Sequence, residues 1–342
     1  MAPVLHPQTG VSLRPFNTLG IAATARFLLP VHSVEDLRAV RADPVLGALP
    51  RLVLGGGSNL LFTHDVDGLV LHMRGTGIAV VGETGDAVLV RAAAGESWHG
   101  LVAWTLAHGL GGLENLSLIP GSVGASPIQN IGAYGSELKD CFHQLTAFDF
   151  VTGELLTLDR AACEFGYRDS VFKHRLRDRA VILDVTFALP RQWQPNLRYA
   201  ELAQEIAARG LIAPGAADIS TAVIAIRQRK LPDPALLGNA GSFFKNPVVP
   251  EALREALLAR HPQLVSYAQG DGSYKLAAGW LIDQCGWKGK VMGAAGVYEK
   301  QALVLVNRGG ASGEEIVALA EAIQRDVESR FGVRLEPEPV YV

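Results

Sequence analysis

The chain has 342 residues, of which 49% are hydrophobic, and its 31 basic and 34 acidic residues leave a formal net charge of -3. This length predicts two or three folding units with a substantial core, and the hydrophobic content excludes a mainly disordered chain. Neither sign of charge forms a long run, so there is no electrostatic case for nucleic acid or a membrane surface as a partner, and we expect small-molecule ligands.

The cysteines and the N-terminal segment narrow the class of protein further. Cys141, Cys163 and Cys285 are odd in number, far apart and without the paired spacing of zinc ligands. We therefore expect reduced, buried thiols and no metal site. The N-terminal segment has no basic stretch followed by an apolar run, and no apolar stretch is long enough to cross a bilayer. These features predict a soluble cytoplasmic protein.

The first chemical signal follows a short strand. The pattern predicts strands over residues 25–29 and 52–54, with a helix over 34–40 between them that begins at a Ser33 and Asp36 capping pair. The second strand runs into Gly55-Gly56-Gly57-Ser58-Asn59. Three glycines let backbone N–H groups turn toward an anion such as a pyrophosphate. Leu60 stands where GxGxxG needs its third glycine, so no Rossmann unit is implied, and a flexible hairpin turn is the alternative.

The second signal is a long polar segment over residues 111–138. Strands over 69–71, 78–81 and 88–92 and a helix from Ser97 to Gly109 precede it. The segment is poor in charge, and its small residues, such as Gly121 and Gly124, permit close approach of the backbone to a ligand. Gln129 and Asn130 each offer a donor and an acceptor, as the edge of a flavin ring needs. The alternative is a structural loop that covers a sheet.

The middle of the chain predicts strands over 145–149, 155–158 and 181–189, and helices over 200–209 and 221–229. Between them Arg168, beside Tyr167 and near Lys173, offers a guanidinium that can clamp a carboxylate in a bidentate way. An arginine paired with Asp169, or a solvated cluster, is the alternative.

The last third combines a tight bend with a polar group of side chains. Over residues 238–247, small residues are followed by the hydroxyl of Ser242, Lys245 and Asn246, and an ordinary turn entering a strand is the alternative. Helices are expected over 250–259, 275–285 and 316–331, a Gly-rich loop over 267–273 and a strand over 302–306. In a final strand from residue 333, Glu336 and Glu338 share one face, and two solvated carboxylates are the alternative.

Seven strings in this order resemble one enzyme family. They are LGGGSNLLF, GLENLSLIPGSVGASPIQNIGAYG, FGYRDSVFK, KLPDPALLGNAGSFFKNP, KLAAGWLIDQCG, QALVLVN and LEPE. Jointly they resemble the UDP-N-acetylenolpyruvoylglucosamine reductase (MurB) family, over a span from about Asn17 to Glu338, and in particular its branch with a substrate-covering tyrosine loop.

The resemblance implies an α+β FAD-binding fold of the vanillyl-alcohol oxidase type with an additional α+β substrate-binding domain. The division that follows is an FAD-binding subdomain over 1–72, a second over 73–230 joined by the strand 332–342, and a substrate-binding domain over 231–331. The implied reaction is a two-stage reduction in peptidoglycan precursor synthesis. NADPH reduces non-covalently bound FAD, and UDP-N-acetylglucosamine enolpyruvate then receives the hydride and becomes UDP-N-acetylmuramate.

The resemblance also implies roles for named residues. By similarity, Ser242 is the general acid that protonates C2, while Arg168 and Glu338 hold the enolic carboxylate. Glu338 is preferred to Glu336 for this role on its spacing from Ser242. The positions that match contacts to the nucleotide sugar are Tyr199, Lys230, Asn246, Tyr267, Gln301 and, with a role toward FAD or the substrate, Arg227. The positions that match FAD-binding segments are Gly55, Gly56, Gly57, Ser58, Asn59, Ser122, Gly124, Ser126, Gln129, Asn130 and Ile131.

Two other functions stay open on the sequence. An FAD-linked oxidase of the same fold, acting on another sugar or alcohol with oxygen as acceptor, would not need Lys230, Asn246 or Gln301. A non-enzymatic flavin or nucleotide-sugar sensor would bind the same ligands without turnover. We further expect a monomer whose partners are small molecules.

Overall fold

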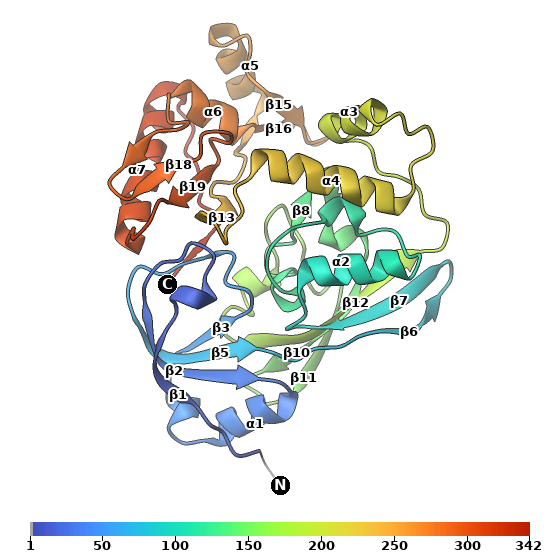
Figure 1. The fold of residues 1–342 in the computed structure, drawn as a ribbon, viewed down its shortest axis with the longest axis vertical. Coiled ribbons are helices and arrows are strands. Elements are labelled where there is room, and N and C mark those ends of the chain that lie inside the picture. The colour runs from blue at the N-terminus through green and yellow to red at the C-terminus, as the bar shows by residue number, and fades with distance from the viewer. Residues whose placement is uncertain (1–2) are drawn as a thin grey trace. The chain divides into compact units, whose positions relative to one another are not determined.

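Two compact units make up the computed structural model, which describes residues 3–342 (Figure 1). Unit 1 comprises residues 3–11, 24–57 and 66–229, and unit 2 comprises 12–23, 58–65 and 230–342. Residues 332–342 belong to unit 2. The three-part division over 1–72, 73–230 and 231–331 stays a prediction.

Unit 1 is built on two β-sheets with helices packed on them. Its first sheet has the strand order β1-β2-β5-β3 and its second the order β11-β10-β12-β7-β6. Its sheet strands are β1 (Gln8–Ser12), β2 (Thr24–Val31), β3 (Arg51–Leu54), β5 (Val66–Met73), β6 (Ile78–Thr84), β7 (Ala87–Ala93), β10 (Phe142–Asp149), β11 (Leu155–Asp159) and β12 (Ala180–Pro190). Its α-helices are α1 (Val34–Ala42), α2 (Trp98–Ala107), α3 (Ala200–Ala208) and α4 (Ala216–Lys230). Its shorter elements are η2 (Leu46–Ala48), η3 (Glu114–Leu116), η4 (Val123–Ala125), β8 (Gly132–Ala133), β9 (Ser136–Glu137), η5 (Leu138–Asp140) and η6 (Val171–Lys173).

The sheets differ in how their strands pair. In the first sheet β2 and β3 both run parallel to β5, whereas every pair in the second is antiparallel. The hairpin between β10 and β11 turns at Gly153, whose φ of 79° favours glycine. One hydrophobic core fills the space between the second sheet and α2, where the Trp98 ring meets Phe187 edge to face at 5.8 Å. A second core lies under α1.

Helix starts in unit 1 follow the predicted capping. Ser33 Oγ accepts the Asp36 N–H at 3.4 Å, and Asp36 Oδ2 accepts the Ser33 N–H at 3.0 Å, which confirms the capping pair of α1. Ser97 Oγ likewise accepts the Gly100 N–H at the start of α2. These contacts satisfy N–H groups that lack a partner in the first turn of a helix.

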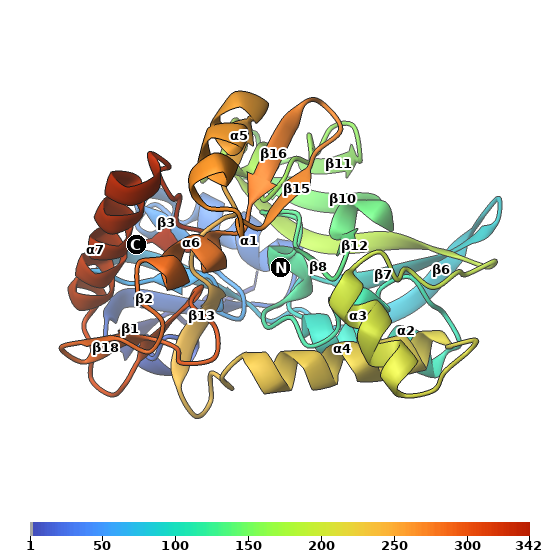
Figure 2. The same ribbon diagram turned by 90° about the horizontal axis from the view of Figure 1, so that it is seen from above.

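The start of α4 differs from the prediction of a helix over 221–229. The helix begins five residues earlier, at Ala216, where Asp218 Oδ2 accepts the Gly215 N–H at 2.9 Å. Asp, Ser and Thr favour caps, which makes Thr221 look like a helix start, but its Oγ1 instead donates to the Ala217 carbonyl inside the helix at 2.8 Å. The apolar sides of α3 and α4 form their own small core, and the two helices lie side by side in Figures 1 and 2.

Unit 2 contains a four-stranded sheet, a three-stranded sheet and three α-helices. The strand orders are β13-β19-β18-β17 and β14-β16-β15, and β20 pairs in parallel with β4. Its elements are η1 (Arg14–Phe16), β4 (Leu60–Leu61), β13 (Gly238–Ser242), β14 (Val248–Pro250), α5 (Glu251–Arg260), β15 (Ser266–Ala268), β16 (Ser273–Leu276), α6 (Ala278–Gln284), β17 (Val291–Met292), β18 (Ala295–Val297), β19 (Val304–Asn307), α7 (Gly313–Phe331) and β20 (Val340–Tyr341). The predicted α7 is confirmed with its Ser312 and Glu315 capping box and with Gly332 at φ 66° as its end.

Two predictions within unit 2 are wrong. Residues 267–273 do not form one loop, because β15 and β16 make a hairpin that turns through Gly270 and Gly272, both at φ 85°. The helix expected over 275–285 starts only at Ala278, since Lys275 and Leu276 belong to β16. A strand and a helix can place the same apolar residues on one side over so short a run, so periodicity alone did not separate them.

The C-terminal segment also departs from the expected strand. Residues 333–336 are irregular, Pro337 forms an isolated bridge with Phe244, and the paired strand is β20. Glu336 and Glu338 therefore do not share an environment: the Glu336 side chain is 69% exposed and paired with Lys245, whereas Glu338 is only 9% exposed. A proline follows each glutamate and interrupts the ladder on which the alternation depends.

Candidate active site

Two loops of unit 1 meet at a glycine cradle. A Cβ atom on Gly55 would lie 2.2 Å from Ser122 Oγ, and one on Gly56 would lie 2.8 Å from the Gly121 Cα. Only glycine fits at this distance, so the backbone N–H groups of the two loops stay accessible at close quarters. Ser122 Oγ is buried without a hydrogen-bond partner. A phosphate or flavin oxygen would supply that partner, so these residues fit FAD.

Arg168 is docked onto the second of these loops. Its Nη2 donates to the Gly132 carbonyl at 2.8 Å, and Ser170 Oγ donates to the Ile128 carbonyl at 2.7 Å. Arg168 has φ 54°, a left-handed conformation that costs energy in a residue with a side chain and is common at functional sites. Unit 1 thus brings the predicted carboxylate-binding arginine against the predicted FAD-binding segment.

Several predicted FAD residues have their side chains used within the loop itself. Asn130 Nδ2 donates to the Gly166 carbonyl at 2.9 Å and to Glu137 Oε2 at 3.1 Å, and its Oδ1 accepts the Lys139 N–H at 3.0 Å. Ser126 Oγ donates to the Val123 carbonyl at 2.6 Å. These side chains hold the shape of the loop, so their backbone is the part suited to face a ligand.

Arg227 is a partly buried cation beside the same segment of unit 1. Burial lowers its pKa, and the Tyr134 hydroxyl, its hydrogen-bond partner, offsets part of that cost. Its Nε atom is buried without an acceptor. Burial, more than the neighbouring charges, raises the pKa of Tyr134 to about 12, so that hydroxyl stays neutral. Burial, followed by repulsion from Arg227, lowers the pKa of His99. A cation so placed fits an anionic group of a ligand.

Unit 2 brings together three predicted residues that are far apart in the sequence. The Glu338 N–H donates to the carbonyl of Phe243, the residue after Ser242, at 2.8 Å. Asn59 Nδ2 donates to the Glu338 carbonyl at 3.2 Å. Ser242 ends β13, so a strand end, a loop and the C-terminal segment place a hydroxyl, an amide and a buried carboxyl in one neighbourhood. Such a set can donate a proton and bind a carboxylate.

The other predicted substrate residues occupy distinct elements. Lys230 ends α4 and Tyr199 precedes α3 as its N-cap. Asn246 Oδ1 accepts the Ala278 N–H at 2.9 Å, so this side chain caps α6. Tyr267 lies on β15 and is half exposed, and Gln301 Oε1 accepts the Leu303 N–H at 3.3 Å. Their contacts with a substrate stay predictions.

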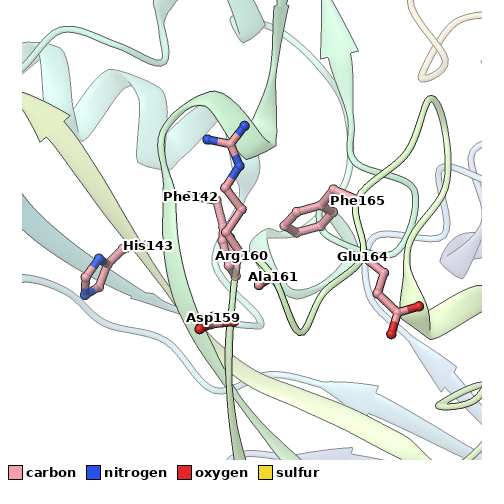
Figure 3. Close-up of a pocket in the computed structure, with 7 residues that line it drawn as sticks. All are labelled: Phe142, His143, Asp159, Arg160, Ala161, Glu164 and Phe165. Atoms are coloured by element: carbon pink, nitrogen blue, oxygen red, sulfur yellow. The ribbon is translucent and has the colours of Figure 1, made fainter.

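A surface depression of about 800 Å³ in unit 1 is not part of this set (Figure 3). It is lined by Phe142, His143, Asp159, Arg160, Ala161, Glu164 and Phe165. None of the predicted site residues lines it, and Asp159, Arg160 and Glu164 are exposed. Within residues 3–342, moreover, no three His, Cys, Asp or Glu side chains gather as metal ligands.

Sequence reasoning did not single out three residues that shape this region of unit 1. Glu114 and Asn115 are buried in the long polar segment, and Tyr134 links Arg227 to Tyr199. The sequence did contain a signal for Glu114, since it is an acidic residue in a segment that is otherwise poor in charge. If such a residue is buried, it needs a specific hydrogen-bond partner.

Comparisons with known proteins identify the family. A model described as the C-terminal domain of UDP-N-acetylenolpyruvoylglucosamine reductase matches residues 233–342, and an FAD binding domain model matches residues 25–159. A UDP-N-acetylenolpyruvoylglucosamine reductase from Ralstonia nicotianae is 62% identical over 95% of this chain and 96% of its own. The chain belongs to the UDP-N-acetylenolpyruvoylglucosamine reductase family. A reductase of the same name from Azoarcus is 59% identical over 100% of this chain and 99% of its own.

The fold agrees with this family membership. The crystal structure of UDP-N-acetylenolpyruvylglucosamine reductase from Thermus caldophilus matches with a TM-score of 0.68 and 24% identity, covering 99% of each chain. The expected α+β FAD-binding fold is therefore confirmed. The expectation that this chain is an FAD-dependent oxidoreductase is confirmed as well. The glycine cradle and Ser122 lie within residues 25–159, the span of the FAD binding domain model.

Proposed function

We propose that this protein catalyses the NADPH-dependent, FAD-mediated reduction of UDP-N-acetylglucosamine enolpyruvate to UDP-N-acetylmuramate in peptidoglycan precursor synthesis. The observation that carries the proposal is the sequence identity of 62% and 59% to two reductases of that name, over 95% and 100% of this chain. When bound, FAD takes a hydride from NADPH and supplies one to the vinyl C3 of the sugar nucleotide. The chain's own task is to hold the two substrates, stabilise the negative charge that develops, and deliver a proton to C2.

The charge and the proton define roles for three residues. Hydride addition at C3 leaves negative charge at C2, which the neighbouring carboxylate delocalises. Arg168 and Glu338 hold that carboxylate, the guanidinium through paired N–H donors and the buried carboxyl by sharing a proton. Ser242 Oγ donates the proton to C2 as the general acid. The burial of Glu338 and its closeness to the residue after Ser242 support this assignment.

The remaining predicted residues bind the two ligands. The cradle of Gly55 to Asn59 and the segment from Ser122 to Ile131 hold FAD, with Ser122 Oγ as a donor. Lys230 contacts a phosphate of the nucleotide sugar, and Tyr199 covers the substrate. Asn246, Tyr267, Gln301 and Arg227 complete the substrate contacts.

The partners of the enzyme are small molecules. We propose that it acts as a monomer in the cytoplasm, without nucleic acid or membrane. The net charge of only -3 gives no electrostatic attraction to nucleic acid or a membrane surface. Across residues 3–342 the structure contains no helix long and apolar enough to span a bilayer.

The test separates the two half-reactions. Ser242→Ala is expected to undergo flavin bleaching by NADPH at a near-normal rate, but to regain its yellow colour at least about a hundredfold more slowly with the enolpyruvyl substrate in the absence of oxygen. Ser329→Ala, at an exposed position of α7, is the matched control and should behave as wild type in both steps. Equal losses in both half-reactions of Ser242→Ala would refute its role as the acid. Oxygen consumption with a sugar alcohol would favour an oxidase instead, and a failure to oxidise NADPH when substrate is supplied would favour a sensor.

A further inference from the structure

The connection from β12 to α3 is an irregular segment over residues 191–199, which we call the strap. It ends at Tyr199, which is 38% exposed. Trp193 and Leu197 of the strap pack against the small core of α3 and α4. Gly111 lies directly against the Trp193 ring, since a Cβ at Gly111 would be 2.4 Å from Trp193 Cδ1. The strap is therefore fixed against its own unit by packing near its beginning and its end.

Two buried polar residues of η3, Glu114 and Asn115, form hydrogen bonds with the strap. Trp193 Nε1 donates to Glu114 Oε1 at 2.9 Å, and Asn115 Nδ2 donates to the Asn196 carbonyl at 2.9 Å. The second oxygen of Glu114 accepts the Gly112 N–H at 2.5 Å. Both oxygens of this carboxylate are thus used, one on each side, to join the long polar segment to the strap.

A second set of contacts lies closer to Tyr199. Asn196 Nδ2 donates to the Gly135 carbonyl and to Ser136 Oγ, each at 2.9 Å. The Tyr134 ring then meets the Tyr199 ring edge to face, with centroids 5.2 Å apart. Asn115 Nδ2 also donates to the Tyr134 carbonyl at 2.8 Å, so this single amide fixes both the strap and the residue on which Tyr199 rests.

A purely structural link would not need a buried carboxylate. Burying an ionised group is costly unless it is hydrogen-bonded, and the partners of Glu114 here are two neutral N–H donors. What the carboxylate provides is a strong, directional bond to the indole N–H that an apolar pair could not reproduce. The contacts of the neighbouring Asn115 reach Tyr134, whose ring packs against the exposed Tyr199 side chain.

We propose that Glu114 and Asn115 are positioning residues that keep Tyr199 in the orientation in which it covers the sugar nucleotide. The inference rests on the proposed role of Tyr199 in substrate binding. When an anchor is lost, the strap spends less time in the competent arrangement, and the apparent affinity falls in proportion to the fraction that remains competent. The chemical step, which Tyr199 does not perform, keeps its rate once substrate is bound.

The test removes the bonds of one anchor residue at a time in the FAD-loaded enzyme. Trp193→Phe keeps the ring and loses the N–H that Glu114 accepts, and Asn115→Ala loses the two donations to the carbonyls of Tyr134 and Asn196. Each is expected to raise the KM for UDP-N-acetylglucosamine enolpyruvate about tenfold, with kcat within about twofold of wild type and unchanged flavin content. Trp104→Phe is the matched control, since Trp104 lies on α2 and stacks on His108, and its KM should not change. Should one of these two anchor variants fail to fold, the KM of the other still decides the test.

A double-mutant cycle separates positioning from a structural effect. In a Tyr199→Ala background, Trp193→Phe should raise KM no further, because it acts through the placement of the Tyr199 side chain, which that background lacks. An unchanged KM in the folded anchor variants would overturn the inference. So would a KM that Trp193→Phe raises in the Tyr199→Ala background by as much as it does in wild type. If Tyr199→Ala itself leaves KM unchanged, the proposed role of Tyr199 in substrate binding is wrong, and the positioning inference falls with it.

Discussion

The glycine cradle allows a quantitative test of where FAD binds. Gly56 has an ordinary backbone conformation, so replacing it by alanine introduces no dihedral strain. The new Cβ would lie 2.8 Å from the Gly121 Cα, well inside the 3.4 Å at which ordinary van der Waals contact begins. The atom it meets belongs to backbone, so no rotamer change relieves the contact, and one of the two loops must move.

The size of the effect follows from what overpacking costs. Forcing one extra methyl group into a closely packed site costs about 1–3 kcal/mol. If that cost falls on the arrangement that binds FAD, the FAD dissociation constant of Gly56→Ala rises by about 5-fold to about 140-fold, because each 1.4 kcal/mol is a factor of ten.

The assay titrates FAD into deflavinated protein and follows the quenching of flavin fluorescence. Gly215→Ala is the control, since its Cβ would meet Asp218 Oδ2 at an ordinary 3.6 Å while the loss of backbone freedom in the unfolded chain is the same. The thermal midpoint of each variant without FAD separates weaker binding from general destabilisation. A dissociation constant for Gly56→Ala within twofold of that for Gly215→Ala would refute the cradle as the FAD site.

Three further predictions address single side chains. Glu338→Gln should lower kcat at least about a hundredfold, whereas Glu336→Gln should stay within twofold because the Glu336 carboxylate is largely exposed where it pairs with Lys245; steady-state kinetics of both variants decides. Arg227→Met should raise the KM for the sugar nucleotide about tenfold without lowering the thermal midpoint, since it removes a partly buried cation whose Nε has no acceptor, and a fall in the midpoint with unchanged KM would contradict this. The hydrogen bonds from Arg179 lower the pKa of Asp149 from 3.8 to about 2. This pair therefore stabilises the fold above about pH 4, and its contribution is lost as the pH falls from about 4 to about 2. Thermal midpoints measured over about pH 2–6 should show this loss in wild type and not in Asp149→Asn.

Local signals in the sequence were sufficient for most elements. The capping boxes at Ser33 and Ser312 depend only on residues three positions apart, and both were predicted and found. The helix expected over 275–285 was misread because Lys275 and Leu276 are held in β16 by pairing with β14 and β15, and such pairing leaves no mark on the helical spacing of their neighbours. Tertiary pairing, which a single sequence does not display, decided these cases.

The same limit applies to the site. The chemistry of Ser242, Arg168 and the glycine run is legible in residue types, so these positions could be singled out and then named through the family resemblance. The anchors around the strap could not, because Glu114 and Trp193 are separated by many residues and neither belongs to a motif of fixed spacing. Their relation exists only once the long polar segment and the strap have folded against each other.

The two C-terminal glutamates show why a neighbouring carboxylate cannot replace the one proposed for catalysis. Alternation along a strand would give both the same face, but the segment is paired only through the isolated bridge at Pro337 and then again from Val340, and the two side chains differ in exposure. Glu338 is buried because its N–H bonds to Phe243 and its carbonyl to Asn59, both far away in the sequence. The Glu336 carbonyl also accepts a backbone N–H, that of Lys245 at 2.9 Å, but the Glu336 side chain extends outward to the Lys245 ammonium and is 69% exposed. In Glu338→Gln the Glu336 carboxylate is still present two residues away in the sequence, but it lies in solvent. There it can neither share a proton with a bound carboxylate nor restore turnover.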